Sequence, residues 1–529
     1  MRTNIPIEAN GHYSVDVTGL TAPFAFLASG TVGGRTVSLY SMATQADVGG
    51  TINITPFTDL MIRNIAASAV DAYINNGSFS GLTQGQLDAQ RVVLTNQLAP
   101  ALTAMGLSSS IDLLRATFNA NSTGLDRFMD VVRVSTTPTT ATITNILDAA
   151  NTLIIDTTTG VATGTLGIAN LAPTGTPADQ IKQTFQAFAG LFATSLPNPT
   201  NPNLVALFSS TFLDGGENLS AFLTDITTRQ NLIGLNLSNL VVDSVDVTAG
   251  TAQVHFVPVN GAGANLTSEG AISWQVKRNG SGVWQAAGDQ RIAFVGVRTV
   301  ARQNICTAGS ANCQPSGTTR FTGLNLAIYN QGLLPIGSAV VTGPGLPGGG
   351  VTLTAPPNVT SFTISAPCQG CSGDIFTDRF TMTDSQIAGL LPNSSYTIQL
   401  FSNDATPVLM ATYTEVVPVP PVLNLALPSL AYPSITNRQS LANITAATLT
   451  PSWQIPAGLL GDDLSVSVFQ SVQNGQNLNV RADVRTNGTA TSGTSTLVIT
   501  APTTDSWTDG WYFIKANDQH GGQVSTFYQ

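Results

Sequence analysis

The spacing of hydrophobic positions divides the first 170 residues into a strand-rich stretch and a helix-rich stretch. Apolar and polar residues alternate at Tyr13-Ser-Val15-Asp-Val17, as in a half-buried strand. After Pro56 the apolar residues recur every three or four positions, as on one face of a helix. The predicted strands are 8–17, 34–40 and 50–54, the predicted helices are 59–74, 84–105, 110–118 and 124–133, and one or two hairpins follow at 134–170.

A second change of pattern begins at Thr176-Pro177, which combines a helix N-cap with proline at the first helical position. The helix that starts here is predicted to end near Ser195. The next predicted elements are helices at 203–212 and 217–228 and strands at 239–248, 251–259, 268–278, 282–287 and 291–302. Helices followed by a run of antiparallel strands are typical of an α+β unit.

The helical period disappears from about residue 318 onward, where short alternating strands are separated by Gly, Pro and Asn turns, a pattern typical of β-sandwiches. The proline-rich stretch Val417-Pro-Val-Pro-Pro421 is predicted to be a stiff linker. The fold class predicted is therefore multidomain α+β. The predicted domains are 1–55, a partial β-sandwich with late strands only; 56–172, a helical unit with a β-hairpin; 173–303, an α+β domain; 304–416, a β-sandwich; and 417–529, a C-terminal β-sandwich.

The segment Asn10-Gly-His-Tyr-Ser-Val-Asp-Val-Thr-Gly-Leu20 resembles the closing strands of a carboxypeptidase-regulatory-like sandwich. Its continuation at 39–41 and 50–60 is similar to poorly characterised bacterial surface proteins and lipoproteins. The resemblance implies several strands before this segment, so either the sequence starts late or another chain supplies a strand by donor-strand complementation. The residues expected to form a strand-exchange segment are Ile5, Ile7, Tyr13, Val15 and Val17.

Two further stretches resemble known domain families. Trp274-Gln-Val-Lys-Arg-Asn-Gly-Ser-Gly-Val-Trp284 looks like the late hairpin of an NTF2-like cone, in which helices pack into a curved antiparallel sheet. The segment around Tyr396 resembles the tyrosine corner of fibronectin type III domains, and Trp511-Tyr512 is its counterpart in the last domain. Such modules connect and bind more often than they catalyse, which is an analogy at the level of fold.

Charge is scarce in this chain: Asp, Glu, Lys and Arg make up 9% of the 529 residues, against roughly a quarter in ordinary soluble domains. A surface of short neutral polar side chains has a low desolvation cost and little like-charge repulsion when it meets another such surface. This profile favours a secreted protein, displayed or polymerised outside a cell, over a cytosolic enzyme.

The sign of the net charge excludes some partners. A net charge of −10 argues against nucleic acid and against electrostatic docking on anionic lipid. No apolar run reaches the roughly 18–20 residues that span a bilayer, so no membrane span is expected. The first residues lack the apolar region of a signal peptide, which conflicts with an extracellular protein. The missing early strands favour a truncated or mature start over an intracellular protein.

The four cysteines form two close pairs, Cys306 with Cys313 and Cys368 with Cys371, in Gly- and Ser-rich loops. An even number with local spacing predicts two small disulfides in an oxidising compartment. A zinc site made by the four thiolates and free thiols are the alternatives.

Residues for catalysis are sparse. The three histidines, His12, His255 and His520, lie on three different predicted units, so a His-based triad or metal site would have to cross domains. No Gly-x-Ser-x-Gly elbow occurs. His255, alone in its predicted strand, is interpreted as structural.

Two loops could bind a ligand. Asp505, Asp509 and the pair Asp462-Asp463 place carboxylates in predicted loops of the last domain, so calcium is the remaining cofactor candidate, with solvated turn carboxylates as the alternative. An exposed Trp507 could stack on a sugar ring or pack at a sandwich edge.

The first hypothesis is a non-enzymatic extracellular structural protein, a self-assembling subunit of a bacterial surface filament or layer, with itself as partner and no resident cofactor. The alternative is a cell-surface adhesin that binds a glycan. An enzyme that uses the NTF2-like pocket is the third hypothesis.

Overall fold

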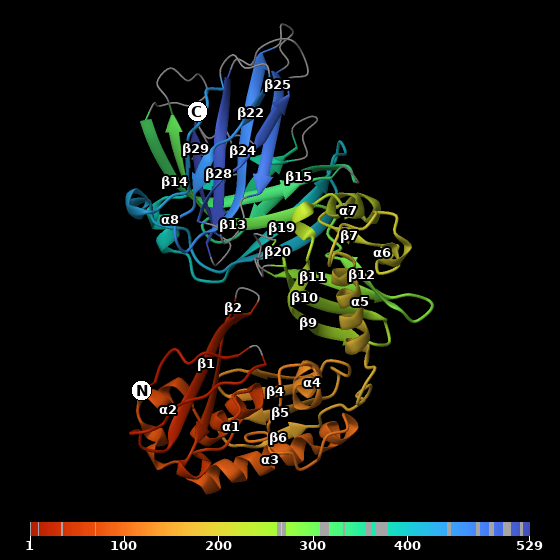
Figure 1. The fold of residues 1–529 in the computed structure, drawn as a ribbon, viewed down its shortest axis with the longest axis vertical. Coiled ribbons are helices and arrows are strands. Elements are labelled where there is room, and N and C mark those ends of the chain that lie inside the picture. The colour runs from red at the N-terminus through yellow and green to blue at the C-terminus, as the bar shows by residue number, and fades with distance from the viewer. Residues whose placement is uncertain are drawn as a thin grey trace.

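The chain is described by a computed structural model, which is a mixed α+β protein with many β-sheets (Figure 1). The structure describes residues 2–528 apart from 9, 33–34, 69, 262–265, 267–270, 307–316, 332–333, 356–360, 365–378, 442–445, 472–476, 486–490, 501–508 and 519–521.

The N-terminal part combines a hairpin, helices and a small sheet (Figure 1). The hairpin consists of β1 (Phe24–Val32) and β2 (Arg35–Ala43). The helices are α1 (Pro56–Ala66), α2 (Val70–Asn75), α3 (Gln84–Ala104) and α4 (Gly124–Val131). An antiparallel four-stranded meander follows, made of β3 (Val132–Thr136), β4 (Thr140–Asn145), β5 (Thr152–Asp156) and β6 (Ala162–Gly164).

The central part packs helix α5 (Pro177–Leu191) on an antiparallel sheet of order β12-β11-β10-β9. Its strands are β9 (Asn236–Asp246), β10 (Thr251–Val259), β11 (Ile272–Arg278) and β12 (Trp284–Gly288). The smaller elements are α6 (Pro202–Val205), β7 (Leu213–Asp214), β8 (Glu217–Asn218) and α7 (Leu219–Ile226). The predicted start of α5 is confirmed, because Thr176 caps the helix and Pro177 is its first residue.

The C-terminal part is built on a seven-stranded sheet of order β18-β14-β13-β29-β28-β24-β25. Its strands are β13 (Phe294–Cys306), β14 (Gly317–Tyr329), β18 (Arg379–Thr381), β24 (Leu460–Ser471), β25 (Asn477–Arg485), β28 (Asp509–Asn517) and β29 (Gln523–Tyr528). A five-stranded sheet contains β15 (Ile336–Thr342), β16 (Val351–Thr354), β17 (Thr363–Ile364), β19 (Ser394–Ser402) and β20 (Leu409–Val417), with α8 (Asp384–Ala388) before β19. Two small sheets hold β21 (Ser434–Thr436), β23 (Ser452–Gln454) and β26 (Ser492–Thr494), and β22 (Ala446–Leu449) with β27 (Leu497–Thr500). Short 3-10 turns lie at Gln45–Asp47, Ser78–Gly81, Gln230–Leu232 and Asn424–Ser429.

Strand pairing differs from the predicted layout in two places. The strand predicted at 291–302 as the last strand of the central unit is β13, which pairs with β14 and, in parallel, with β29. The seven-stranded sheet also takes strands from both sides of the predicted boundary at 416/417. These pairings join residues far apart in the chain, and local periodicity carries no information about them.

Three local predictions near the N-terminus are wrong. Residues 110–118 form turns instead of a helix, since the Asp112 carboxylate accepts hydrogen bonds from the backbone N–H groups of Leu114 and Arg115 at 3.0 Å each. This Asx-type arrangement competes with helix formation. The predicted strands at 8–17 and 50–54 are not paired in any sheet of the described chain.

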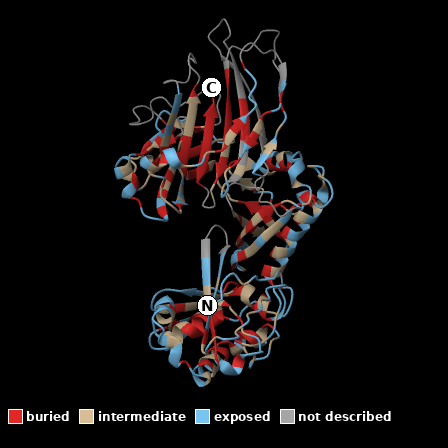
Figure 2. Ribbon diagram, turned by 60° about the vertical axis from the view of Figure 1, so that its left-hand side comes forward, coloured by how far each residue is buried: buried red, intermediate tan, exposed pale blue. Residues whose placement is uncertain are grey.

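One hydrophobic core includes residues of both the N-terminal and the central part. Figure 2 shows buried residues in both parts. The backbone N–H of Val245 in β9 donates to the carbonyl of Ile146 at 3.2 Å, and Arg127 of α4 pairs with Asp179 of α5. A second core lies between the five-stranded sheet and the β13–β14 end of the large sheet, and a third lies under β24 and β28. The two C-terminal cores therefore share one sheet.

Candidate functional site

The segment that contains the five predicted strand-exchange residues doubles back on itself at the N-terminus. The backbone N–H of Glu8 donates to the carbonyl of His12 at 2.8 Å, and the Arg2 guanidinium donates to the carbonyls of Asp16 and Thr18 at 3.1 and 3.0 Å. The predicted turn at Asn10-Gly is therefore present, although no strand ladder follows it in the described residues.

Alternating exposure persists along this segment. Tyr13, Val15 and Val17 are half-buried while the residues between them are exposed, as expected for an extended chain with one covered face. Ile5 is half-buried and Ile7 is exposed. The segment has the side-chain pattern of a strand without main-chain pairing.

Tyr13 attaches the segment to the hairpin and to the loop before α1. Its hydroxyl donates to the carbonyl of Ile52 at 2.7 Å, and its ring lies 6.3 Å from the ring of Phe26 in β1. Burial raises the pKa of Tyr13 to about 12, so the hydroxyl stays a donor at every physiological pH.

The β1–β2 hairpin rises from the N-terminal part in both views (Figures 1 and 2). Its two nine-residue strands pair in continuous register from Phe24–Ala43 to Val32–Arg35, and neither is joined to another described strand. Leu27 of β1 is 57% exposed. An isolated two-stranded hairpin of this length is marginal in water unless something packs on it.

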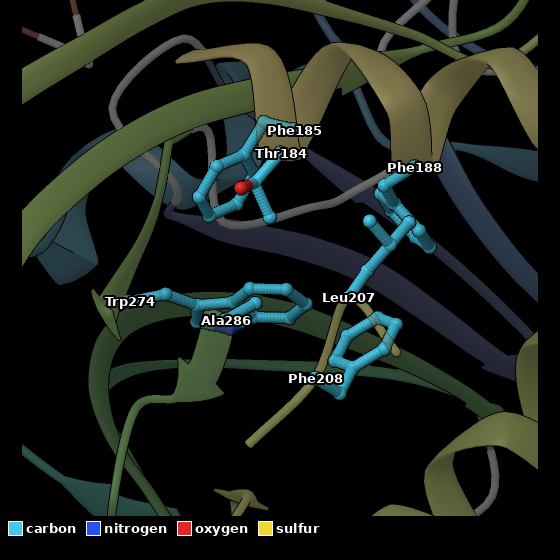
Figure 3. Close-up of a pocket in the computed structure, with 7 residues that line it drawn as sticks. All are labelled: Thr184, Phe185, Phe188, Leu207, Phe208, Trp274 and Ala286. Atoms are coloured by element: carbon cyan, nitrogen blue, oxygen red, sulfur yellow. The ribbon is translucent and has the colours of Figure 1, made fainter. Parts of the chain in front are cut away.

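Aromatic side chains fill the interior of the central part (Figure 3). Phe185 and Phe188 from α5 face Trp274 of β11 and Phe208, and the space between them does not admit a water molecule. The ring centroids of Phe185 and Trp274 are 6.2 Å apart, and those of Phe188 and Phe208 are 5.5 Å apart. This interior is packed as a core.

One carboxyl group at the edge of this aromatic core is unusual. Asp214 accepts hydrogen bonds from the indole N–H of Trp274 at 2.9 Å and from the backbone N–H of Asp289 at 3.2 Å. Burial, reinforced by the nearby Asp289 carboxylate, raises the pKa of Asp214 to about 7. The site can therefore hold a proton near neutral pH, although its two hydrogen bonds also fix the Trp274 ring.

His255 has a carboxylate partner that the sequence interpretation missed. Its Nδ1 lies 2.7 Å from the Asp243 carboxylate on the neighbouring strand β9, where a β-bulge displaces the register. Val254 and Phe256 point into the core, so His255 points to the opposite, outer face of the sheet. The short connection between β9 and β10 could have revealed this cross-strand proximity.

The predicted cysteine pairs lie mostly outside the described residues. Cys306 ends β13, is buried and is disulfide-bonded. Cys313, Cys368 and Cys371 are not among the described residues, so the pairing stays a prediction.

The residues predicted to bind calcium or a glycan are also not described by the structure. Asp505 and Trp507 lie outside the described residues, and the side chains of Asp462, Asp463 and Asp509 are not described. Within the described ranges no three His, Cys, Asp or Glu side chains converge as a metal site. In the same part of the chain, no helix is long and apolar enough to cross a membrane.

Comparison with known proteins adds no relative. No family model matches the chain, and no curated protein matches it.

Proposed function

We propose that the chain is a non-enzymatic extracellular structural protein, a self-assembling subunit of a bacterial surface filament or layer. The observation that carries this proposal is the β1–β2 hairpin, which is long, regular and paired with no other strand among the described residues. Sheet edges of this kind are templates for pairing with another chain.

Two further features support the proposal. The low charge of the sequence weakens repulsion between copies. The disulfide-bonded state of Cys306 fits an oxidising compartment outside the cytosol.

The domain types of the central and C-terminal parts belong to the same proposal. We infer an NTF2-like unit formed by α5 and the sheet β9–β12, with its interior filled by aromatic side chains, and two C-terminal sandwiches that share the seven-stranded sheet. A filled interior favours a connecting module over a binding module in this unit.

Sedimentation velocity of the full chain across a concentration series, at low and at high salt, tests the proposal. Association through neutral β-rich surfaces should persist at high salt, because screening acts on charges. A chain that sediments as a monomer at every concentration would contradict the proposal, and dissociation by salt alone would point to charged contacts instead.

A further inference from the structure

The two edges of the β1–β2 hairpin are not equivalent. On β2, the backbone N–H of Tyr40 donates to the Asp59 carboxylate at 3.1 Å, and the hydroxyl of Thr58 donates to the carbonyl of Tyr40 at 3.3 Å. Both partners belong to α1. Helix α1 therefore occupies the outward main-chain groups of β2 at Tyr40.

The same contacts identify the outward groups of β1. Because both main-chain groups of Tyr40 point away from β1, its partner Leu27 belongs to a non-hydrogen-bonded pair and also points its N–H and C=O outward. The register is regular, so Ala25 and Ser29 point outward as well. Among the described residues, nothing hydrogen-bonds to the main chain of these three positions.

Strand β1 also lacks the features that protect sheet edges. Its sequence, FAFLASGTV, contains no charged residue and no proline, and its pairing has no bulge. Natural edges are blunted by charges, prolines, bulges or short length. The edge strands β9 and β20 have such protection, since both have register shifts and carry acidic residues such as Asp246 and Glu415.

We infer that β1 pairs with β1 of a second copy of this chain, antiparallel about a two-fold axis, to form a four-stranded sheet across the joint. This inference rests on the proposed function and specifies its partner and its edge. A neutral strand is compatible with itself, because antiparallel pairing brings no like charges together. Such a joint is isologous and closes with two copies, so a filament or layer would need a second joint elsewhere on the chain.

The N-terminal segment is a weaker donor than β1. The hydroxyl of Tyr13 is bonded to Ile52 and its ring lies on Phe26 of the same chain, so exchange would first break these contacts. Among the described residues no hydrogen bond uses the outward main-chain groups of Ala25, Leu27 and Ser29, so no such bond has to break before a partner strand pairs with β1.

A proline at an outward position tests the inference with a matched control. Ser29→Pro removes an N–H that the hairpin does not use, and Ser38→Pro does the same on the opposite strand β2, where Ser38 pairs with Ser29. Light scattering of the full chain should give twice the 54.9 kDa chain mass, or a multiple of it, for the natural chain and for Ser38→Pro. Ser29→Pro should halve the mass of the smallest assembly.

A charge substitution provides a second, independent variant. Leu27→Lys should also separate the copies, because lysine is a natural edge protector and this side chain is already solvated. Val161→Lys is its control, since Val161 is 57% exposed in the same N-terminal part. Thermal melts of all four variants check that each still folds.

The outcomes separate the inference from the proposed function. Assembly that survives Ser29→Pro and Leu27→Lys overturns the β1 joint and leaves self-assembly standing. Dissociation by Ser38→Pro alone overturns it in favour of the β2 edge. A fifth variant, Val15→Pro, alters the N-terminal segment, and dissociation by this variant alone overturns the inference in favour of strand exchange. A natural chain that is monomeric throughout overturns both.

Discussion

Asp214 should make the stability of the central part fall as pH rises. Its pKa is raised from 3.8 to about 7 in the folded protein, first by burial and then by the Asp289 carboxylate. Between these two values the folded chain keeps a proton that the unfolded chain has released. Stability therefore decreases through this interval and levels off above pH 7.

The size of the effect follows from the shift. Each pKa unit corresponds to about 1.36 kcal/mol, so the natural chain should lose roughly 4 kcal/mol from this group between pH 4 and pH 8. Asp214→Asn stays neutral and keeps an oxygen to accept the Trp274 N–H bond. At pH 8 we expect this variant to unfold roughly 8–16 °C above the natural chain. The N-terminal and central parts share one core, and 1 kcal/mol moves the unfolding midpoint of a unit as large as these two parts together by about 2–4 °C.

Calorimetry between pH 5 and pH 8 is the assay, and Asp246→Asn in the same sheet is the control. The Asp246 carboxylate is exposed and accepts the backbone N–H of Ala249 at 2.8 Å. The control should keep the pH slope of the natural chain. Equal slopes for Asp214→Asn and the natural chain would contradict a raised pKa of Asp214 in the folded protein, as would a variant destabilised at every pH.

Three other substitutions or treatments have defined outcomes. Arg115→Met should cost roughly 3 kcal/mol in urea unfolding at neutral pH, because it strips the 2.7 Å partner from the 3% exposed Asp47 carboxylate. Burial opposes the charge of Asp47, but hydrogen bonds from Thr44 and Arg115 hold its pKa below the usual range. The stability lost in Arg115→Met should therefore shrink in acid, where the carboxylate becomes protonated. An equal loss of stability at all pH values would contradict this. Tyr396→Phe should cost about 1 kcal/mol, since its hydroxyl donates to the Pro344 carbonyl at 3.0 Å, and an unchanged midpoint would show that the bond is neutral. Thiol labelling of the unfolded, unreduced chain should modify none of the four cysteines, and any label would contradict two disulfides.

Local signals predicted two of the longer helices correctly. The start of α5 was predictable because Thr176, Pro177 and Asp179 form a capping box with proline at the first helical position. The helix predicted at 84–105 matches α3, which begins after the N-cap Thr83. These features depend on residues a few positions apart, which a single sequence displays directly.

The sequence did not predict which strands pair when they lie far apart in the chain. β13 was predicted as a strand, but its parallel partner β29 lies more than two hundred positions later, so no periodicity could join them. The unpaired edge of β1 is likewise visible only when the positions of Asp59 and Thr58 around Tyr40 are known. The strand-exchange residues follow from a family resemblance that implies missing early strands and from the alternation at 13–17, whereas the structure assigns them to a segment that joins no sheet among the described residues.

Negative-stain microscopy of native, undenatured protein shows whether the chain assembles with itself. We expect regular assemblies whose repeat contains two N-terminal parts in contact. A field of single particles, at concentrations where the protein is fully folded, would contradict self-assembly as the function of this chain.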